Sequence, residues 1–303
     1  MSTAEEPTMW NNRIVVGYDG SESSTNAATW AAREAISRGI GLSIINAMTP
    51  PVSGGAWGPG MQIGIETLEK IRESAQSSLD DFAATLGVKD VQTHADIGSP
   101  TGLLLAASET AELVVVGSRG HGGFKELLLG SVSQQLVAHA DSPVVVVRDG
   151  SESTKDSVVV GVDGSKASNV AIDFAFEYAS RHQLKVIAVH AWDVPSFDLI
   201  VMPNTPVPVE MVDVTDSEVR LAAELLAGFE ATYPDVKLET RVVRGTAVNA
   251  ILSAQPEAAL IVVGSRGHGS VVGAVLGSVS HGVLHQAKIP VAVVTQEAQR
   301  GNG

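Results

Sequence analysis

The chain has 303 residues, of which 44% are hydrophobic, so it is long enough for two ordinary domains that each bury a core. It contains no cysteine, which excludes disulfides, thiolate metal sites and cysteine nucleophiles, and favours a reducing compartment. The net charge of −14 predicts a surface that repels nucleic acid.

The N-terminal segment 1–12 is polar and acidic, and it lacks the basic stretch and apolar core of a secretory signal. No apolar run approaches the roughly eighteen residues that a membrane-spanning helix needs. We therefore expect a soluble, cytoplasmic protein that neither crosses nor binds a membrane.

Strands and helices alternate along the first half of the chain. Apolar runs and helical periodicity predict, in order, a strand at 13–18, a helix at 23–38, strand 42–47, helix 65–86, strand 91–97, helix 101–109, strand 113–116, helix 131–139 and strand 144–147. Uninterrupted apolar strands separated by helices are typical of a parallel sheet that is covered on both faces.

The second half repeats this pattern. After the polar segment 149–156, strands are predicted at 158–162, 184–191, 236–243, 260–263 and 291–294, with helices near 171–178 and up to about 233. We therefore predict an α/β protein with two tandem domains, 1–148 and 157–303, that are joined by a linker at 149–156.

Both halves carry the same glycine-rich loop after the fourth strand. Residues 115–122 and 262–269 are identical, and each loop follows the spacing Gly-x2-Gly-x9-Gly-Ser, with members Gly117, Gly120, Gly130, Ser131 and Gly264, Gly267, Gly277, Ser278. Glycine lets backbone N–H groups approach an anion, and Gly-Ser begins a helix whose free N–H groups favour one. We call each loop with its helix start a cradle, the first and the second.

The spacing distinguishes these cradles from other phosphate loops. A Walker A loop needs a lysine, but Leu129 precedes Gly130 and Leu276 precedes Gly277. A dinucleotide fingerprint follows the first strand, where this chain instead has Asp19 and Asp163, whose carboxylates could accept hydrogen bonds from ribose hydroxyls.

Taken together, these motifs resemble the universal stress protein family in its ATP-binding subclass. The cradle spacing resembles that family's ATP signature, and Val15–Asp19 and Val159–Asp163 resemble its opening strand. The resemblance implies two Rossmann-like, doubly wound domains, each with a five-stranded parallel sheet in the order 3-2-1-4-5 and helices on both faces. It also implies pairing of domains through their last strands, and hence a homodimer.

The resemblance further implies the nucleotide contacts. Adenine and ribose would lie near the first-strand aspartates, the residues after the second strand and the glycines after the third strand, which are Asp19, Ala47, Gly98, Asp163, Ala191 and Gly245. Phosphates would contact the cradles, including Val132 and Val279.

Several residues admit a structural interpretation beside a functional one. Asp19 and Asp163 could be helix caps, Arg119 and Arg266 solvated loop residues, and His121 and His268 loop residues without a catalytic role. His281 and His285 have a zinc-compatible spacing, but no acidic residue completes a metalloprotease motif. Asn46 and His190, at equivalent positions, are interpreted as packing residues.

The leading hypothesis is a non-enzymatic regulator of the stress response that binds ATP, together with Mg²⁺, at two sites per chain and acts on a protein partner. One alternative is a slow ATPase or an adenylate-forming hydrolase. Another is a scaffold with vestigial cradles.

Overall fold

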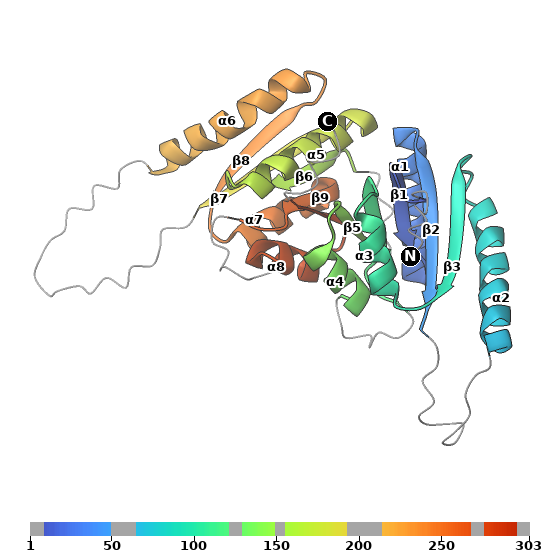
Figure 1. Cartoon of the computed structure of the whole chain (residues 1–303). Coiled ribbons are helices and arrows are strands. Elements are labelled where there is room, and N and C mark those ends of the chain that lie inside the picture. The colour runs from blue at the N-terminus through green and yellow to red at the C-terminus, as the bar shows by residue number, and fades with distance from the viewer. Residues whose placement is uncertain are drawn as a thin grey trace, which may run out of the picture.

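The strands in the described part of the chain lie in one sheet. The computed structural model describes residues 9–49, 65–120, 129–148, 155–192, 214–267 and 276–295. The sheet has ten strands in the order β3-β2-β1-β4-β5-β10-β9-β6-β7-β8 (Figure 1). The bounds are β1 (Arg13–Gly17), β2 (Gly41–Met48), β3 (Val91–Ile97), β4 (Leu113–Gly117), β5 (Val144–Val147), β6 (Ser157–Gly161), β7 (Lys185–Trp192), β8 (Leu238–Arg244), β9 (Ala258–Gly264) and β10 (Val291–Val294).

The predicted fold class is confirmed. Within each half the five strands run parallel in the order third, second, first, fourth, fifth. Strand polarity and the intervening helices give the doubly wound topology, in which ligands bind at the carboxyl ends where the strand order reverses.

Helices cover both faces of the sheet because its strands bury side chains on both sides. Ile14 and Val16 of β1 belong to one core, whereas Val15 belongs to the other. The first core packs under α1 (Glu22–Arg38), α2 (Ile65–Ala84), α5 (Lys166–His182) and α6 (Val214–Thr232). The second packs under α3 (Pro100–Ser108), α4 (Ser131–His139), α7 (Ala247–Ala254) and α8 (Ser278–Gln286), and a short 3₁₀ turn, Gln255–Glu257, follows α7.

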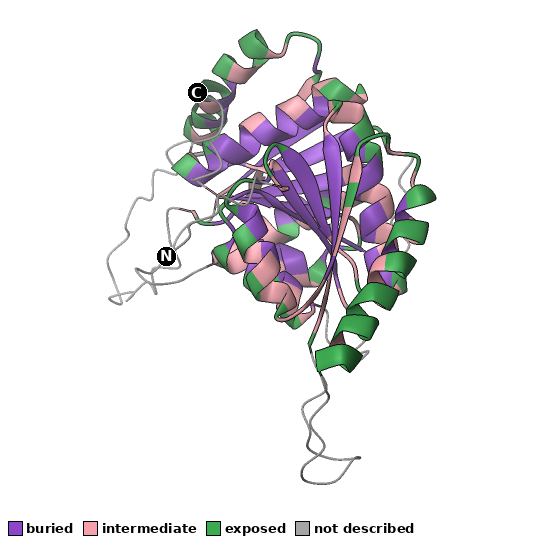
Figure 2. Ribbon diagram, turned by 45° about the vertical axis from the view of Figure 1, so that its right-hand side comes forward, coloured by how far each residue is buried: buried purple, intermediate pink, exposed green. Residues whose placement is uncertain are grey.

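Burial follows this layering. Figure 2 shows buried strands at the centre and exposed outer faces on the helices. None of the helices in the described ranges combines the length and apolar character needed to cross a membrane.

The two halves join edge to edge through their last strands. β5 and β10 pair antiparallel, with Val145 opposite Ala292. This pairing corrects the expected route to a homodimer, because both strand edges through which two chains would pair are already occupied within one chain. Homodimerisation itself stays a prediction. Of the predicted linker 149–156, residues 149–154 lie outside the described residues.

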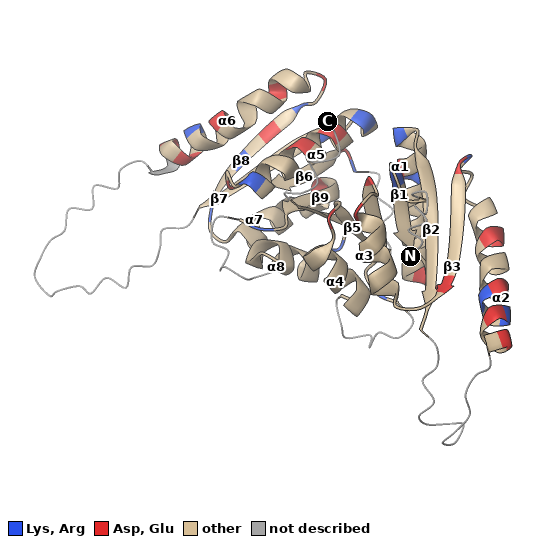
Figure 3. Ribbon diagram, viewed as in Figure 1, with Lys and Arg blue, Asp and Glu red and all other residues tan. Residues whose placement is uncertain are grey.

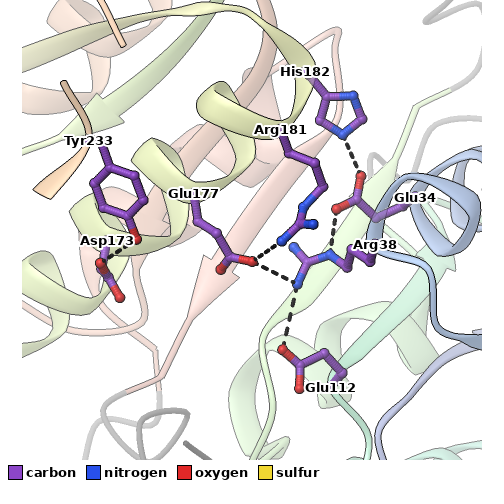
Figure 4. A network of polar contacts seen from close by, with 8 residues as sticks. All are labelled: Glu34, Arg38, Glu112, Asp173, Glu177, Arg181, His182 and Tyr233. Atoms are coloured by element: carbon purple, nitrogen blue, oxygen red, sulfur yellow. Dashed lines mark hydrogen bonds and ion pairs between the residues drawn. The ribbon is translucent and has the colours of Figure 1, made fainter. Parts of the chain in front are cut away.

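A second contact between the halves is ionic. The Glu34 carboxylate on α1 accepts hydrogen bonds from Arg38 Nε, at 2.5 Å, and from His182 Nε2 on α5, at 2.7 Å (Figure 4). Glu112 and Glu177 each lie 3.6 Å from Arg38 Nη1. The halves therefore share both apolar cores, one on each face of the sheet, and an ionic cluster around Glu34 and Arg38.

Candidate functional site

Each half contains a cavity at the carboxyl ends of its first and fourth strands. The volumes are about 530 Å³ in the first half and about 650 Å³ in the second, within the range typical of small-molecule sites. Most of the predicted site residues line them: Asp19, Ala47, Gly117, Gly120, Gly130, Ser131 and Val132 in the first half, and Asp163, Ala191, Gly264, Gly267, Gly277, Ser278 and Val279 in the second. That these residues contact a nucleotide stays a prediction.

Two further predicted site residues take part in the pairing of strands. Gly98 and Gly245 are not among the residues that line the cavities. Their N–H groups donate to the carbonyls of Met48 and Trp192, both at 2.9 Å, and so extend the pairing of the second and third strands. Gly245 has a φ of 139°, which only glycine adopts without strain.

The first-strand aspartates face the glycine loops and do not cap helices. Ser21 and Ser165 are the N-caps of α1 and α5. Asp19 Oδ1 accepts from the Ser21 N–H at 3.0 Å, and Asp163 Oδ1 accepts from the Ser165 N–H at 2.9 Å. These bonds fix the carboxylates and direct each Oδ2 toward the cradle.

Gly120 and Gly267 allow this close approach. A β-carbon on Gly120 would collide with Asp19 Oδ2, and one on Gly267 would collide with Asp163 Oδ2. Each glycine therefore makes room for a carboxylate at the cavity wall.

Gly117 and Gly264 have a packing role as well. A β-carbon on Gly117 would lie 2.7 Å from the Ser23 carbonyl carbon, and one on Gly264 would lie 2.9 Å from that of Ala167. The first glycine of each motif thus lets α1 or α5 pack tightly against the sheet, beside its place in the cavity.

The third glycine of each motif closes the loop and begins a helix. The N–H of Gly130 donates to Ser118 O at 2.8 Å, and that of Gly277 donates to Ser265 O at 2.7 Å. α4 and α8 then start without a side-chain cap, unlike α1, α3 and α5, which have serine caps. Because the first N–H groups of a helix have no partner within it, these starts can bind an anion.

The charge distribution also suits an anion. Four helices contribute residues to the cavity walls and contain no Asp, Glu, Lys or Arg: α3, α4, α7 and α8. In contrast, α2 and α6 contain many acidic residues (Figure 3). Arg119 and Arg266 line the first and second cavities. The net negative charge of the chain is therefore carried mainly away from the cradles.

The side chains of Asn46 and His190 form hydrogen bonds with the backbone immediately before the two aspartates. Asn46 Nδ2 donates to Tyr18 O at 2.9 Å, and His190 Nδ1 donates to Val162 O at 2.8 Å. His190 Nε2 also lies 2.8 Å from Glu218 Oε2 on α6. The packing interpretation is thus extended, since both side chains hold the carbonyl immediately before the aspartate.

Sequence reasoning missed part of the cavity walls. Pro100 and Leu104 of α3 line the first cavity, and Ala247 and Ile251 of α7 line the second. These residues occupy equivalent positions in the two halves, which could have pointed to a shared role. However, apolar residues on a short helix are ordinarily interpreted as part of the hydrophobic core. His281 also lines the second cavity.

The remaining candidates do not add a metal site. His281 and His285 lie with their rings tilted at 40° and the ring centroids 4.3 Å apart, but within the described residues no group of three or more His, Cys, Asp or Glu side chains could hold a metal ion. His121, His268 and the segments where the loops differ, 123–126 and 270–273, lie outside the described residues.

The chain is similar to known proteins along nearly its full length. The profile of the Universal stress protein family matches residues 11–148 and 155–295. A universal stress protein of Mycolicibacterium smegmatis is 38% identical over 288 residues, which cover 93% of this chain and 96% of that protein. One of Mycobacterium tuberculosis is 35% identical over 299 residues, covering 93% and 96%.

A solved structure has the same fold. The crystal structure of a universal stress protein from Archaeoglobus fulgidus matches with a TM-score of 0.69 at 22% identity, covering 94% of this chain and 99% of that one. At this identity the likeness supports the architecture only.

Proposed function

The chain belongs to the universal stress protein family, and we propose that it is a regulator that binds ATP in two cradles, one in each half. The observation that carries the proposal is the convergence, at both cavities, of an uncapped helix start, a glycine loop and a carboxylate. Phosphates accept from the N–H groups at the starts of α4 and α8. The carboxylates of Asp19 and Asp163 accept from ribose hydroxyls.

The residues present fit this ligand. Each cavity has one polar end, at the helix start, and apolar walls from α3 or α7 that suit a purine base, with Ala47 or Ala191 beside it. The four helices on this side of the sheet bring no carboxylate against the triphosphate. We assign Mg²⁺ to the phosphate oxygens and water, which is its usual coordination in nucleotide sites, and name no protein ligand for it.

We propose that bound nucleotide controls how the chain binds other protein chains. A triphosphate in the cradle changes the charge and shape of the surface at the carboxyl edge of the sheet, which biases homodimerisation or the binding of a regulatory protein partner in the stress response. The same site could support a slow ATPase or an adenylate-type hydrolase, and the experiments below separate these functions.

The decisive experiment measures released nucleotide. Protein is purified in its native state and denatured, and the small molecules released are identified and counted by mass spectrometry. ATP at close to two per chain supports both cradles, and close to one supports unequal cradles. Absence of nucleotide, followed by absence of binding when ATP is added, overturns the proposal.

Turnover tests the alternative. Steady-state phosphate or AMP release that disappears in the Asp19→Ala/Asp163→Ala variant would favour an enzyme. Turnover indistinguishable from buffer would leave the binding function alone.

A further inference from the structure

The two cradles differ in one ionisable side chain. His281 is the fourth residue of α8 and lines the second cavity. Its equivalent in α4 is Gln134, which is not among the residues that line the first cavity. The two helix starts are otherwise alike, since Ser-Val-Ser follows the N-cap glycine in both.

The position of His281 directs its ring toward the phosphate end of the cavity. Helical side chains lean toward the N-terminus, so a residue in the second turn covers the first turn. The His281 N–H donates to Gly277 O at 2.9 Å, so its Cα lies directly over the N-cap glycine. The side chain is exposed to solvent.

Charged groups of both signs lie around His281. The His285 ring lies against it at a tilt of 40°, Arg148, the residue after β5, lies near His285, and Arg266 and the Asp163 carboxylate line the same cavity. α7, which packs against α8 through Val248 and Gly282, brings no charged side chain. Burial, then the charges of His281 and Arg148, lower the pKa of His285.

We propose that His281 is a phosphate-binding residue of the second cradle, and that it makes nucleotide binding there dependent on pH while the first cradle lacks this dependence. The inference rests on the proposed function. A protonated imidazole donates a charge-assisted hydrogen bond to a phosphate oxygen, whereas Gln134 keeps the same charge at every pH.

Binding at the second cradle therefore takes up a proton. A bound triphosphate places negative charge beside the His281 ring, which favours the protonated form of that ring. The proton comes from solvent and resides on the His281 ring. Affinity at the second cradle then increases, relative to the first, as pH falls from 8 to 6.

The experiment compares the cradles with the same ligand. ATP affinity is measured by calorimetry at pH 6 and pH 8 in two backgrounds, Gly120→Val, which leaves the second cradle, and Gly267→Val, which leaves the first. Because the terminal phosphate of ATP titrates in the same range, the first cradle serves as the control for the ligand. We expect the ratio of second-cradle to first-cradle affinity to rise about tenfold from pH 8 to pH 6.

Exchange of the two residues tests the assignment. His281→Gln in the Gly120→Val background is expected to abolish the rise, and Gln134→His in the Gly267→Val background to create one. Both loops contain a histidine, His121 and His268, so the exchange isolates position 281.

A second readout needs no silenced cradle. Proton uptake on ATP binding is measured for the unmodified chain and for His281→Gln in two buffers of different ionisation enthalpy, and the unmodified chain is expected to take up more. ATP binding with equal proton uptake and an unchanged ratio would overturn the role of His281 and leave the proposed function standing. Absence of ATP binding in the unmodified chain would overturn both.

Discussion

The Glu34 carboxylate in the first half accepts a hydrogen bond from His182 Nε2 in the second half, at 2.7 Å, although 148 positions separate the two residues. Glu34 is 1% exposed. Burial works to raise the pKa of this carboxyl, but the His182 hydrogen bond and the charge of Arg38 outweigh it and hold the pKa below its ordinary value. The contact between the halves therefore contains a carboxylate that is kept ionised inside the molecule.

Removing the charge of Glu34 is expected to destabilise the protein. Glu34→Gln leaves the buried Arg38 guanidinium without its nearest counterion, which lowers the free energy of unfolding by about 2–4 kcal/mol in urea denaturation. Glu112→Gln is the matched control, since Glu112 lies 3.6 Å from Arg38 with 38% of its side chain exposed, and it should cost less than about 1 kcal/mol. Equal losses for the two variants would contradict the importance of the buried pair.

The Glu34 carboxylate also predicts how the free energy of unfolding depends on pH under acidic conditions. Because the pKa of Glu34 is lower in the folded state than the ordinary value of 4.5, its contribution is complete above about pH 4.5 and is lost as pH falls through the folded value. The free energy of unfolding of the parent should therefore fall more steeply between pH 5 and pH 3 than that of Glu34→Gln. Other shifted carboxyls, such as Asp90 and Glu239, are common to both proteins and cancel in this comparison. Parallel curves would exclude Glu34 as the source.

The elements and the cradles could be predicted from sequence because their signals are local. Apolar runs such as Val144–Val147, and the spacing from Gly117 to Gly130, follow directly from what a buried strand or an anion-binding loop requires. The tandem repeat then reinforced each assignment, since an element expected in one half was found again in the other.

The contacts between the halves could not be predicted in this way. Equivalent positions carry different residues, with Arg38 matched by His182 and Glu34 by Tyr178, so the repeat gives no sign that they meet. The family resemblance also implied nucleotide contacts for Gly98 and Gly245, which are not among the residues that line the cavities, and those contacts stay predictions. Which side chains meet across a pseudo-symmetric contact is decided by packing between distant segments, which periodicity does not report.

Two substitutions of His190 test the hydrogen bond that it forms with Val162 O beside the second cradle. His190→Asn reproduces the first half, where Asn46 holds the equivalent carbonyl, and should lower the free energy of unfolding by about 1 kcal/mol. His190→Ala leaves Val162 O without this donor and opens a cavity beside Glu218, so we expect about 2–3 kcal/mol. Thermal unfolding of both variants measures the difference. Indistinguishable melting temperatures would show that the bond to Val162 O has little importance.

The carboxylate that faces each glycine loop predicts how binding can be abolished without unfolding the chain. Gly120→Val together with Gly267→Val places side chains where Asp19 Oδ2 and Asp163 Oδ2 lie, so both carboxylates must move and both cavities are partly filled. Since these glycines line cavities at the molecular surface, we expect ATP binding to fall at least about 100-fold by calorimetry, with an unchanged far-ultraviolet circular dichroism spectrum. Gly228→Val is the matched control, because a β-carbon there has no neighbour within 4 Å, and it should bind ATP as the parent does. ATP affinity at the parental level in the folded double variant would contradict the placement of nucleotide in the cradles.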